Sequence, residues 1–147
     1  MLITPRMLGR FTVSYYPYPA RDAKTGKVIE YFRPSVPVQI SKGNQRSFIF
    51  QALVDSGSDR NLFPAKFGEQ IGLDIRSGNK YHIEGIGKYR INVYTHIIGF
   101  HLYNINFQTE ADFCYEQEIP LLGRIGFFDK FKKVSFKEKK RMVEFKT

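Results

Sequence analysis

The sequence predicts a mostly β protein folded as one domain. Short runs of β-branched and aromatic residues recur along the chain of 147 residues, separated by clusters of Gly, Pro, Asn and Lys. The chain is 42% hydrophobic and 16% aromatic, which suffices for a single core and excludes a disordered or collagen-like chain. Only two stretches have the spacing of a short helix, and no internal repeat or low-complexity linker divides the chain.

The N-terminal part of the chain is expected to form strands. Arg10–Tyr18 carries alternating apolar residues, and Pro17 and Pro19 are expected to end this strand in a turn. Residues 23–27 have the composition of a hairpin loop. Val36–Ile40 alternates apolar and other positions, as a strand with one buried face does.

The next strand is expected to lead into a polar loop. A turn at Lys42–Asn44 is followed by Ser47–Val54, which is apolar enough for a central strand buried on both faces. The strand stops at Asp55–Ser58, where the residues are polar and favour a turn. A carboxylate is therefore expected directly at the end of a buried strand.

A short helix and a hairpin are expected in the middle of the chain. Large apolar residues recur every four positions over residues 63–72, with Pro64 suited to a first helical turn and Gly72 suited to close the helix. Within residues 81–97, the segment after Gly85–Gly87 alternates strictly between two faces, one carrying β-branched and aromatic residues and the other mostly polar ones. This pattern predicts a β-hairpin with a glycine-rich tip.

The C-terminal third is expected to be mainly strand, with one further short helix. Its elements in chain order are a strand near Phe100–Phe107, a polar linker through Glu118, the segment Leu121–Arg124, a helical segment at Phe127–Phe131, and a hairpin of Lys133–Lys137 and Met142–Lys146. The turn of that hairpin, residues 138–141, is entirely charged.

Charge and cysteine content bear on the location of the protein. The formal net charge of +9 suits several anionic partners, but charge alone concerns solubility and encounter rather than chemistry. The single cysteine, Cys114, cannot form an intramolecular disulfide, which favours a reducing compartment. Met1–Arg6 is not followed by an apolar signal segment, and no apolar stretch reaches the roughly 18 residues of a membrane span. We therefore expect a cytoplasmic protein without a membrane span.

The strongest signal for chemistry is the sequence Asp55-Ser56-Gly57 at the end of an apolar strand. The tripeptide alone has little specificity, because its usual meaning is a solvated turn. The preceding strand gives it weight, since it would carry the carboxylate into the body of the protein. A carboxylate placed there needs hydrogen bonds or a partner that shares its charge.

Three motifs in this order resemble the retropepsin-like aspartic proteases, the single-domain relatives of pepsin that include the retroviral proteases. Ala52–Asp59 resembles the catalytic loop of this family, and Gly85–Gly87 resembles the tip of its flap. Leu121–Arg124 is similar to the family's hydrophobic-hydrophobic-Gly element and the arginine after it. The resemblance implies an acid-protease barrel with one or two short helices, active as a twofold homodimer.

The resemblance begins near Phe32 and runs to the C-terminus. We therefore expect a retropepsin-like aspartic protease domain over residues 32–147. Residues 1–31 are expected to form an N-terminal extension, β in structure and packed on the core. This extension is an added hairpin, a strand of the dimer interface or a segment removed by self-processing, and the sequence does not choose among these roles.

The chemistry of amide hydrolysis explains why one such loop implies a dimer. Water attack needs a base to take the water's proton and an acid to protonate the carbonyl oxygen or the leaving nitrogen, and two carboxylates sharing one proton do both. The chain has a single Asp-Ser-Gly loop, so two copies of Asp55 must meet across a twofold axis. Mutual repulsion is expected to keep one proton on the pair at acidic pH, with activity falling as that proton leaves. We expect an aspartic endopeptidase that acts on polypeptides and needs no cofactor.

The resemblance also assigns roles to residues around Asp55. Ser56 would join the two loops across the dimer axis through its hydroxyl, and Gly57 would let backbone and substrate approach the carboxylates. Asp59 would bind the substrate backbone, and Arg124 is expected to form an ion pair with Asp59.

The flap and the glycine element complete the expected site. The residues assigned to them are Gly85, Ile86 and Gly87, which would contact substrate, and Leu122, Gly123 and Arg124, which would support the catalytic loop. The glycines of the flap would let it hinge and approach the substrate closely. This flap is more basic and bulkier than that of the retroviral enzymes, and the C-terminal hairpin departs from their intertwined strands, so substrate preference and interface details do not carry over.

Other candidate sites have weaker support. His82, His96 and His101 lack the spacing of metal ligands, and Cys114 has no evident base beside it, so we assign no metal and no thiol nucleophile. The basic segment Lys130–Arg141 is more typical of a solvated hairpin edge than of a nucleic-acid contact, and nucleic acid is not an expected partner. The alternative function is a catalytically inactive retropepsin-like module that binds an acidic partner or nucleic acid.

Overall fold

The computed structural model describes residues 9–147, so the expectation about Met1–Arg6 lies outside the described residues. Strands predominate, and the mostly β class predicted from the sequence is confirmed. With 3-10 turns labelled η, the elements are β1 (Arg10–Ser14), β2 (Tyr16–Arg21), β3 (Val28–Arg33), β4 (Ser35–Lys42), β5 (Gln45–Arg46), β6 (Phe50–Val54), β7 (Leu62–Pro64), α1 (Ala65–Gln70), η2 (Ile75–Ser77), β8 (Asn79–Glu84), β9 (Arg90–Leu102), β10 (Ile105–Cys114), β11 (Leu121–Leu122), η3 (Phe128–Lys130), β12 (Lys133–Lys137), η4 (Glu138–Lys140) and β13 (Met142–Lys146).

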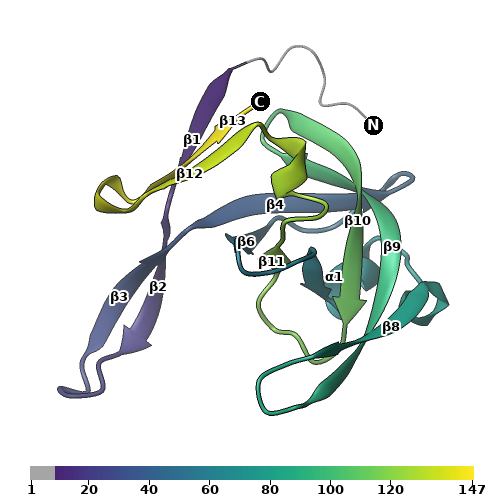
Figure 1. The fold of residues 1–147 in the computed structure, drawn as a ribbon, viewed down its shortest axis with the longest axis horizontal. Helices are drawn as coiled ribbons and strands as arrows, with labels where there is room; N and C mark the ends of the chain where they lie inside the picture. The colour runs from purple at the N-terminus through teal and green to yellow at the C-terminus, as the bar shows by residue number, and fades with distance from the viewer. Residues whose placement is uncertain (1–8) are drawn as a thin grey trace.

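Six strands close into a barrel (Figure 1). The order around it is β4, β6, β11, β7, β10 and β9, and β9 pairs back onto β4. The strands β5 and β8 extend this sheet at its two ends, and α1 packs against β7 and β10. The interior is filled by large apolar side chains such as Phe63, Phe100 and Phe113, which are fully buried. Their burial supplies the main driving force for closing the barrel.

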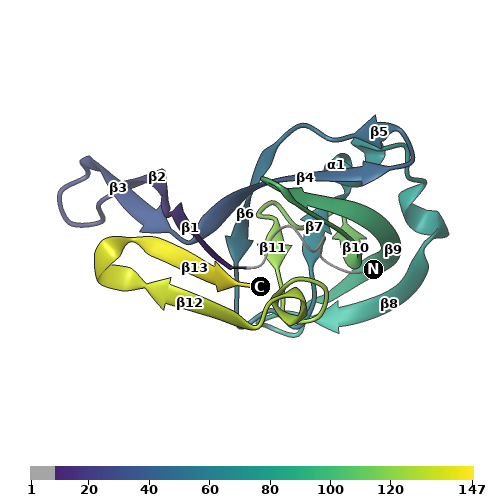
Figure 2. The ribbon, with the colours of Figure 1, turned by 90° about the horizontal axis from the view of Figure 1, so that it is seen from above.

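Both ends of the described chain meet in a second structure beside the barrel, which we call the terminal lobe (residues 9–33 and 132–147). It consists of a three-stranded sheet in the order β1-β13-β12 and the two-stranded ribbon β2-β3. Figure 2 shows both hairpins of the lobe projecting to the same side of the barrel. Phe11 stacks on Phe145 with ring centroids 5.0 Å apart, and Phe145 meets Phe127 and Phe131. This aromatic cluster joins the lobe to the barrel core.

Several predicted elements are confirmed with their boundaries. The closing hairpin has the predicted strands at 133–137 and 142–146, and the loop at 23–27 joins β2 to β3. The hairpin with the glycine-rich tip is formed by β8 and β9. The helix expected over 63–72 is shorter, because its first residues continue as β7 and pair with β10.

Two predictions for the N-terminal half are wrong. The first strand does not end at Pro17 and Pro19, which lie inside β2 opposite Phe32 and Glu30. A two-stranded ribbon leaves its outer edges unpaired, so a missing N–H costs no ladder hydrogen bond there. The run expected from Ser47 becomes a strand only at Phe50, because Ser47 instead turns the chain with its hydroxyl.

Two further predictions fail in the C-terminal half. The strand expected at 100–107 is a tight hairpin, in which β9 ends at Leu102 and β10 begins at Ile105. Tyr103 takes a positive φ of 51° in that turn, which a sequence of apolar residues does not reveal. The helical segment expected at 127–131 is reduced to the 3-10 turn η3. Within residues 9–147, none of the helices has the length and apolar character needed to cross a bilayer.

Candidate active site

The strand β6 delivers Asp55 to the rim of the barrel. This strand lies between β4, which runs antiparallel to it, and β11, which runs parallel. The backbone N–H of Asp55 donates to the carbonyl of Leu122 at 3.0 Å, so the hydrogen bonds between β6 and the β11 segment extend as far as the backbone of Asp55. The side chain of Asp55 is half-buried, as expected for a carboxylate at the end of an apolar strand.

A tight turn fixes the carboxylate of Asp55. The backbone N–H of Gly57 donates to Oδ1 of Asp55 at 2.9 Å, and the N–H of Ser58 donates to the Asp55 carbonyl at 3.1 Å. Ser56 and Gly57 are exposed at the tip of the turn. Among the described residues, no donor reaches Oδ2 of Asp55. The carboxylate is therefore oriented through one oxygen, and the other is open to a ligand.

Gly123 lets the chain after β11 cross directly over the loop after Asp55. A Cβ at this position would overlap the backbone of Arg60, so only glycine fits the crossing. The N–H of Gly123 donates to Oδ1 of the fully buried Asn61 at 3.0 Å. The N–H of Arg124 donates to the carbonyl of Ser58 at 2.9 Å. These contacts place Leu122, Gly123 and Arg124 beside the candidate catalytic loop.

The predicted ion pair between Asp59 and Arg124 is wrong for this structure. Both side chains are exposed, and they form no ion pair with each other. Backbone bonds join the two segments instead, including one of 2.8 Å from the N–H of Ile125 to the carbonyl of Asp59. Exposed charges gain little from pairing, so the backbone contacts suffice to hold the loop.

Arg60, the next residue along, makes the ion pairs of this region. Its Nε donates to Oδ2 of Asp112 at 2.9 Å, and its Nη2 donates to Oε2 of Glu110 at 2.9 Å. Asp112 is almost fully buried near the end of β10, and its carboxylate also accepts from the hydroxyls of Tyr81 and Thr95. A buried carboxylate held by a cation and two hydroxyls is fully compensated.

This network joins the β8-β9 hairpin, which is the candidate flap, to the candidate catalytic loop. Tyr81 lies on β8 and Thr95 on β9, whereas Arg60 follows the Asp55 loop. Burial and the hydrogen bond to Asp112 raise the pKa of Tyr81 well above its ordinary value, so the phenol stays protonated as a donor. Burial alone would lower the pKa of Arg60, but its bonds to Asp112 and Glu110 raise it. The base of the flap is therefore pinned to the rim of the barrel.

The flap tip itself extends into solvent. Residues 85–89 connect β8 to β9, and the N–H of Gly85 donates to the carbonyl of Tyr89 at 3.0 Å. Gly87 and Lys88 both take positive φ, which closes the turn. Ile86 is fully exposed and touches nothing in the described chain that could bury it. An exposed apolar side chain at the tip of a hairpin is suited to contact a bound ligand.

The histidines and the cysteine, to which the sequence assigns no role, make contacts within the fold. His96 Nε2 lies 2.8 Å from the carbonyl oxygen of Ile75, and His101 lies between Ser41 and Asn106. Cys114 is fully buried, and burial raises the pKa of its thiol. Across residues 9–147, no group of three or more His, Cys, Asp or Glu side chains is arranged to hold a metal ion.

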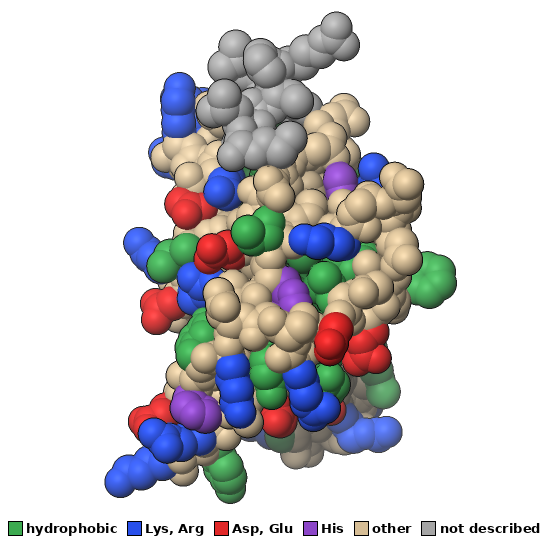
Figure 3. All heavy atoms as spheres, turned by 90° about the vertical axis from the view of Figure 1, so that its right-hand side faces the viewer, with side chains coloured by type: hydrophobic (Ala, Val, Ile, Leu, Met, Phe, Trp, Pro, Cys, Tyr) green, Lys and Arg blue, Asp and Glu red, His purple; other side chains and the backbone are tan. Residues whose placement is uncertain are grey.

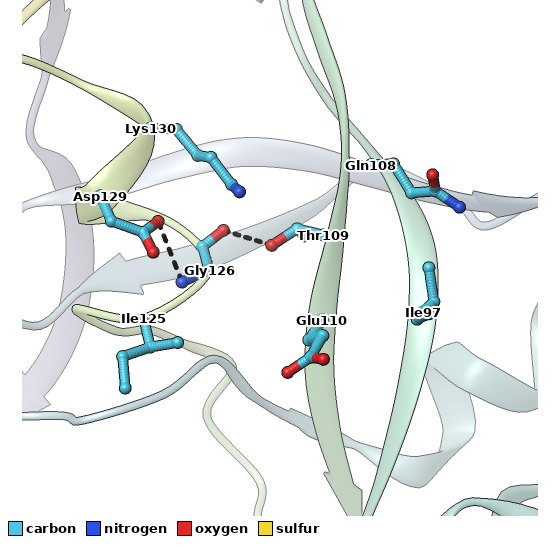
Figure 4. Close-up of a pocket in the computed structure, with 8 residues that line it drawn as sticks. All are labelled: Ile97, Gln108, Thr109, Glu110, Ile125, Gly126, Asp129 and Lys130. Carbon is cyan, nitrogen blue, oxygen red and sulfur yellow. Dashed lines mark hydrogen bonds between the residues drawn. The ribbon is translucent and has the colours of Figure 1, made fainter. Parts of the chain in front are cut away.

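A pocket of about 300 Å³ lies on the flank of the barrel between β9, β10 and the segment before η3 (Figure 4). Gly126 at its edge accepts a hydrogen bond of 2.7 Å from the hydroxyl of Thr109, and its N–H donates to Asp129. Glu110 reaches this pocket from the Arg60 network. Asp55 is not among the residues that line this pocket, so the pocket is separate from the candidate catalytic carboxylate.

Sequence reasoning missed Arg60, Asn61 and Asp112. Asp112 lies in a stretch interpreted as a polar linker, which is in fact the strand β10. The signal was present, because apolar residues alternate with polar ones from Ile105 to Cys114 as a half-buried strand requires. Asn61 carried a weaker signal, a polar residue directly before the apolar run Leu62-Phe63.

Comparisons with known proteins bear on the fold. No protein-family model matches the sequence, and no curated protein matches it either. Among solved structures, a retropepsin-like aspartic protease from Rickettsia conorii superposes with a TM-score of 0.55 and 11% identity, covering 93% of this chain and 90% of that one. The EIAV protease, in complex with the inhibitor HBY-793, gives a TM-score of 0.48 and 18% identity over 70% of this chain and 88% of that one.

The likeness to the Rickettsia conorii protein covers nearly the whole of both chains. This chain itself has a closed barrel of six strands, with β6 and β11 running parallel beside the candidate catalytic loop. At such low identity the likeness concerns architecture alone. The chain therefore has the retropepsin-like fold that its three motifs imply.

Proposed function

We propose that the protein is an aspartic endopeptidase that hydrolyses peptide bonds with two Asp55 carboxylates, one from each copy of a homodimer. The observation that carries this proposal is the carboxylate of Asp55, which is held through Oδ1 by the Gly57 N–H and open at Oδ2. It is presented on a retropepsin-like fold at the rim of the barrel. A carboxylate fixed in this way is oriented for proton transfer without being neutralised by a cation.

The chemistry requires a second carboxylate. One Asp55 takes a proton from water, the water oxygen attacks the peptide carbonyl, and the protonated Asp55 of the other copy donates to the carbonyl oxygen. The tetrahedral diol then collapses as its C–N bond breaks: the first Asp55 gives its proton to the leaving nitrogen, and one diol hydroxyl returns a proton to the second Asp55. The next acidic residue along the chain, Asp59, is exposed and lies beyond the turn. Asp112 is already bound by Arg60. Two copies related by a twofold axis supply the missing group.

The neighbouring residues have proposed supporting roles. Ser56 is exposed at the tip of the turn, where its hydroxyl can bond to the second loop of the dimer. Gly57 keeps the approach to the carboxylate free, since a Cβ there would lie 3.3 Å from Oδ1 of Asp55. Asp59 is exposed toward solvent and is proposed to bind the substrate backbone. Gly85–Gly87 would close over an extended peptide and exclude water.

Peptide cleavage tests the proposal directly. A diverse peptide library is incubated at pH 3 to 8 with wild type, with Asp55→Asn and with Asp74→Asn, and products are read by mass spectrometry. Asp74 is a matched control, because its side chain is exposed and makes no capping hydrogen bond to the turn η2 that follows it. Cleavage by wild type and Asp74→Asn but not by Asp55→Asn is expected. Absence of cleavage by a folded wild-type dimer at every pH would contradict the proposal.

Mixed dimers test the need for two copies of Asp55. Wild type and Asp55→Asn are refolded together in equal amounts, so about one quarter of the dimers carry two intact aspartates. Activity near one quarter of that of the same total amount of wild type is expected. Activity near three quarters would mean that one Asp55 per dimer suffices, and activity near one half would mean that each chain acts alone.

A further inference from the structure

Nearly all of the net charge of the protein lies on the terminal lobe. Residues 9–33 and 132–147 carry 12 Lys and Arg against 4 Asp and Glu, whereas residues 34–131 carry ten of each. The lobe therefore has a formal charge of +8 and the barrel is neutral. The side of the barrel away from the lobe shows acidic and basic side chains interspersed (Figure 3). The two charged segments are far apart in sequence, and the pairing of β1 with β13 brings them together.

Three cations lie in one row across the three-stranded sheet of the lobe. Arg10 is the register partner of Lys146, and Lys146 is the partner of Lys133 on its other side. Like charges directly opposite one another destabilise a sheet. Only Glu144 lies in the next row to offset them, and its pKa is lowered by its hydrogen bond to Lys137 and by the charges of Arg10 and Lys133. An anion bound along this row would relieve the repulsion.

The β2-β3 ribbon carries an aromatic face. Tyr18 is the register partner of Tyr31, and Tyr16 is the partner of Arg33, so these four side chains project from the same face. The guanidinium of Arg33 lies over the ring of Tyr18, 5.0 Å from its centroid. Tyr16 and Tyr31 are 44% and 50% exposed, which leaves their rings open to a ligand. We call Tyr16, Tyr18, Tyr31 and Arg33 the tyrosine face.

The tyrosine face is turned away from the rest of the lobe. The opposite face of the ribbon carries Phe32, and Arg141 of the closing hairpin lies 3.9 Å from the centroid of its ring. Exposure also alternates without interruption from Arg10 to Tyr16, with each even-numbered residue exposed. The cation row and the tyrosine face therefore lie on the same side of the extended stretch formed by β1 and β2. Tyr18 is half-buried, and its hydroxyl donates to the hydroxyl of the buried Ser35 at 3.1 Å, so the other two tyrosines supply the open rings of this face.

We propose that the terminal lobe binds single-stranded nucleic acid, with bases stacking on the tyrosine face and phosphates along the cation row. Bases have apolar faces that stack on exposed aromatic rings, and the chain of phosphates carries the opposite charge to the lobe. A surface that combines aromatic rings with cations suits single-stranded nucleic acid better than an acidic peptide. An acidic peptide offers negative charge but no series of rings for the tyrosines to stack on. Double-stranded nucleic acid keeps its bases stacked internally and would use the cations alone.

This proposal changes the expectation drawn from the sequence. The basic segment Lys130–Arg141 alone is typical of a solvated hairpin edge. The fold adds Arg10 and the tyrosine face, which come from the N-terminal quarter of the chain. The proposal does not depend on peptide cleavage, since none of its residues belongs to the candidate active site.

Binding is tested by fluorescence polarisation with labelled single-stranded RNA and DNA of about 20 nucleotides and the matching duplexes, over a range of salt concentrations. Tyr16→Ala and Tyr31→Ala are each expected to weaken single-strand binding about tenfold. Tyr115→Ala is the matched control, because Tyr115 is also 50% exposed, lies under an arginine, and belongs to the neutral barrel. It is expected to change affinity less than twofold, and the Tyr16 and Tyr31 variants are expected to keep wild-type peptide cleavage.

The cation row is tested by Lys133→Gln with Lys146→Gln. The slope of log affinity against log salt is expected to fall by roughly 1.4 for two lost phosphate contacts on a single strand. Lys66→Gln with Lys80→Gln removes the same charge from the barrel and is expected to leave the slope unchanged. Three results would each overturn the proposal. The first is no saturable binding of the single strands at low salt, and the second is that polyglutamate competes as well as unlabelled single strand. The third is that the tyrosine variants disturb the dimer in sedimentation but leave the affinity for single strands unchanged.

Discussion

Arg60 and Asp112 are joined by a bond of 2.9 Å between Nε and Oδ2, and this pair connects the loop after Asp55 to the strand β10. The Asp112 side chain is 4% exposed, so its charge depends on Arg60 for compensation. Tyr81 and Thr95 add bonds from both strands of the flap hairpin. The loop and the base of the flap therefore share one carboxylate.

Removing Asp112 is expected to destabilise the fold strongly. Asp112→Ala leaves the half-buried guanidinium of Arg60 and the hydroxyl of Tyr81 without their acceptor, with an expected loss of about 3 kcal/mol in the free energy of unfolding. Urea denaturation followed by circular dichroism measures this loss. Glu110→Ala is the control, because Glu110 is 52% exposed and its pair with Arg60 should contribute less than about 1 kcal/mol. Equal losses in the two variants would contradict this account.

Gly123→Ala is expected to disrupt the crossing of the loop and β11. The added Cβ would overlap the backbone of Arg60, so either the loop or the strand must move, at a cost of about 1–3 kcal/mol. Gly85→Ala offers a comparison within the same chain, because a Cβ there meets nothing within 4 Å. Thermal unfolding should show a lowered midpoint for Gly123→Ala and an unchanged one for Gly85→Ala.

Tyr15 is expected to make stability depend on pH in the alkaline range. Burial and the hydrogen bond to Glu138 raise its pKa from 10.0 to about 12. A raised pKa means that the folded state holds the proton more tightly, so the stabilisation is complete below pH 10 and is lost as pH rises through 12. The difference in unfolding free energy between wild type and Tyr15→Phe should therefore shrink between pH 10 and 12 in urea titrations. A constant difference over that range would refute the prediction.

Cys114 is expected to be inert in the folded protein. It is fully buried, and burial raises the pKa of its thiol, so little thiolate is formed or reached by reagent. A colorimetric disulfide reagent should react with one thiol per chain in denaturant and with almost none under native conditions. Rapid reaction of the native protein would show that β10 opens locally.

The sequence predicted best those features that depend on neighbouring residues. The Asp55 turn and the closing hairpin need only local turn chemistry and alternation, and both are formed as expected. The parallel pairing of β6 with β11 is not local and was not predicted; the resemblance of Leu121–Arg124 to a known element placed that segment near the catalytic loop without giving its pairing.

The features that were missed arise from tertiary contacts. Pro17 and Pro19 ordinarily end a strand, but the open edges of the β2-β3 ribbon remove the penalty. The resemblance predicted an ion pair between Asp59 and Arg124, whereas the observed pair is Arg60 with Asp112, whose buried carboxylate needs a cation. Which carboxylate is buried depends on how β10 closes the barrel, and that is not encoded in the spacing of charges.

The strand β13 lies in the middle of its sheet although it comes from the end of the chain. The N–H of Gly9 donates to Oγ1 of Thr147, 138 positions further along. During synthesis, β1 must therefore wait for its partner until all the strands of the barrel have been made, with a long loop still to be closed. Arg10 and the prolines of the following β2 would keep this early segment from joining other nascent chains. The three-stranded sheet of the terminal lobe can thus form only after the barrel strands that lie between its two halves in the chain have been made.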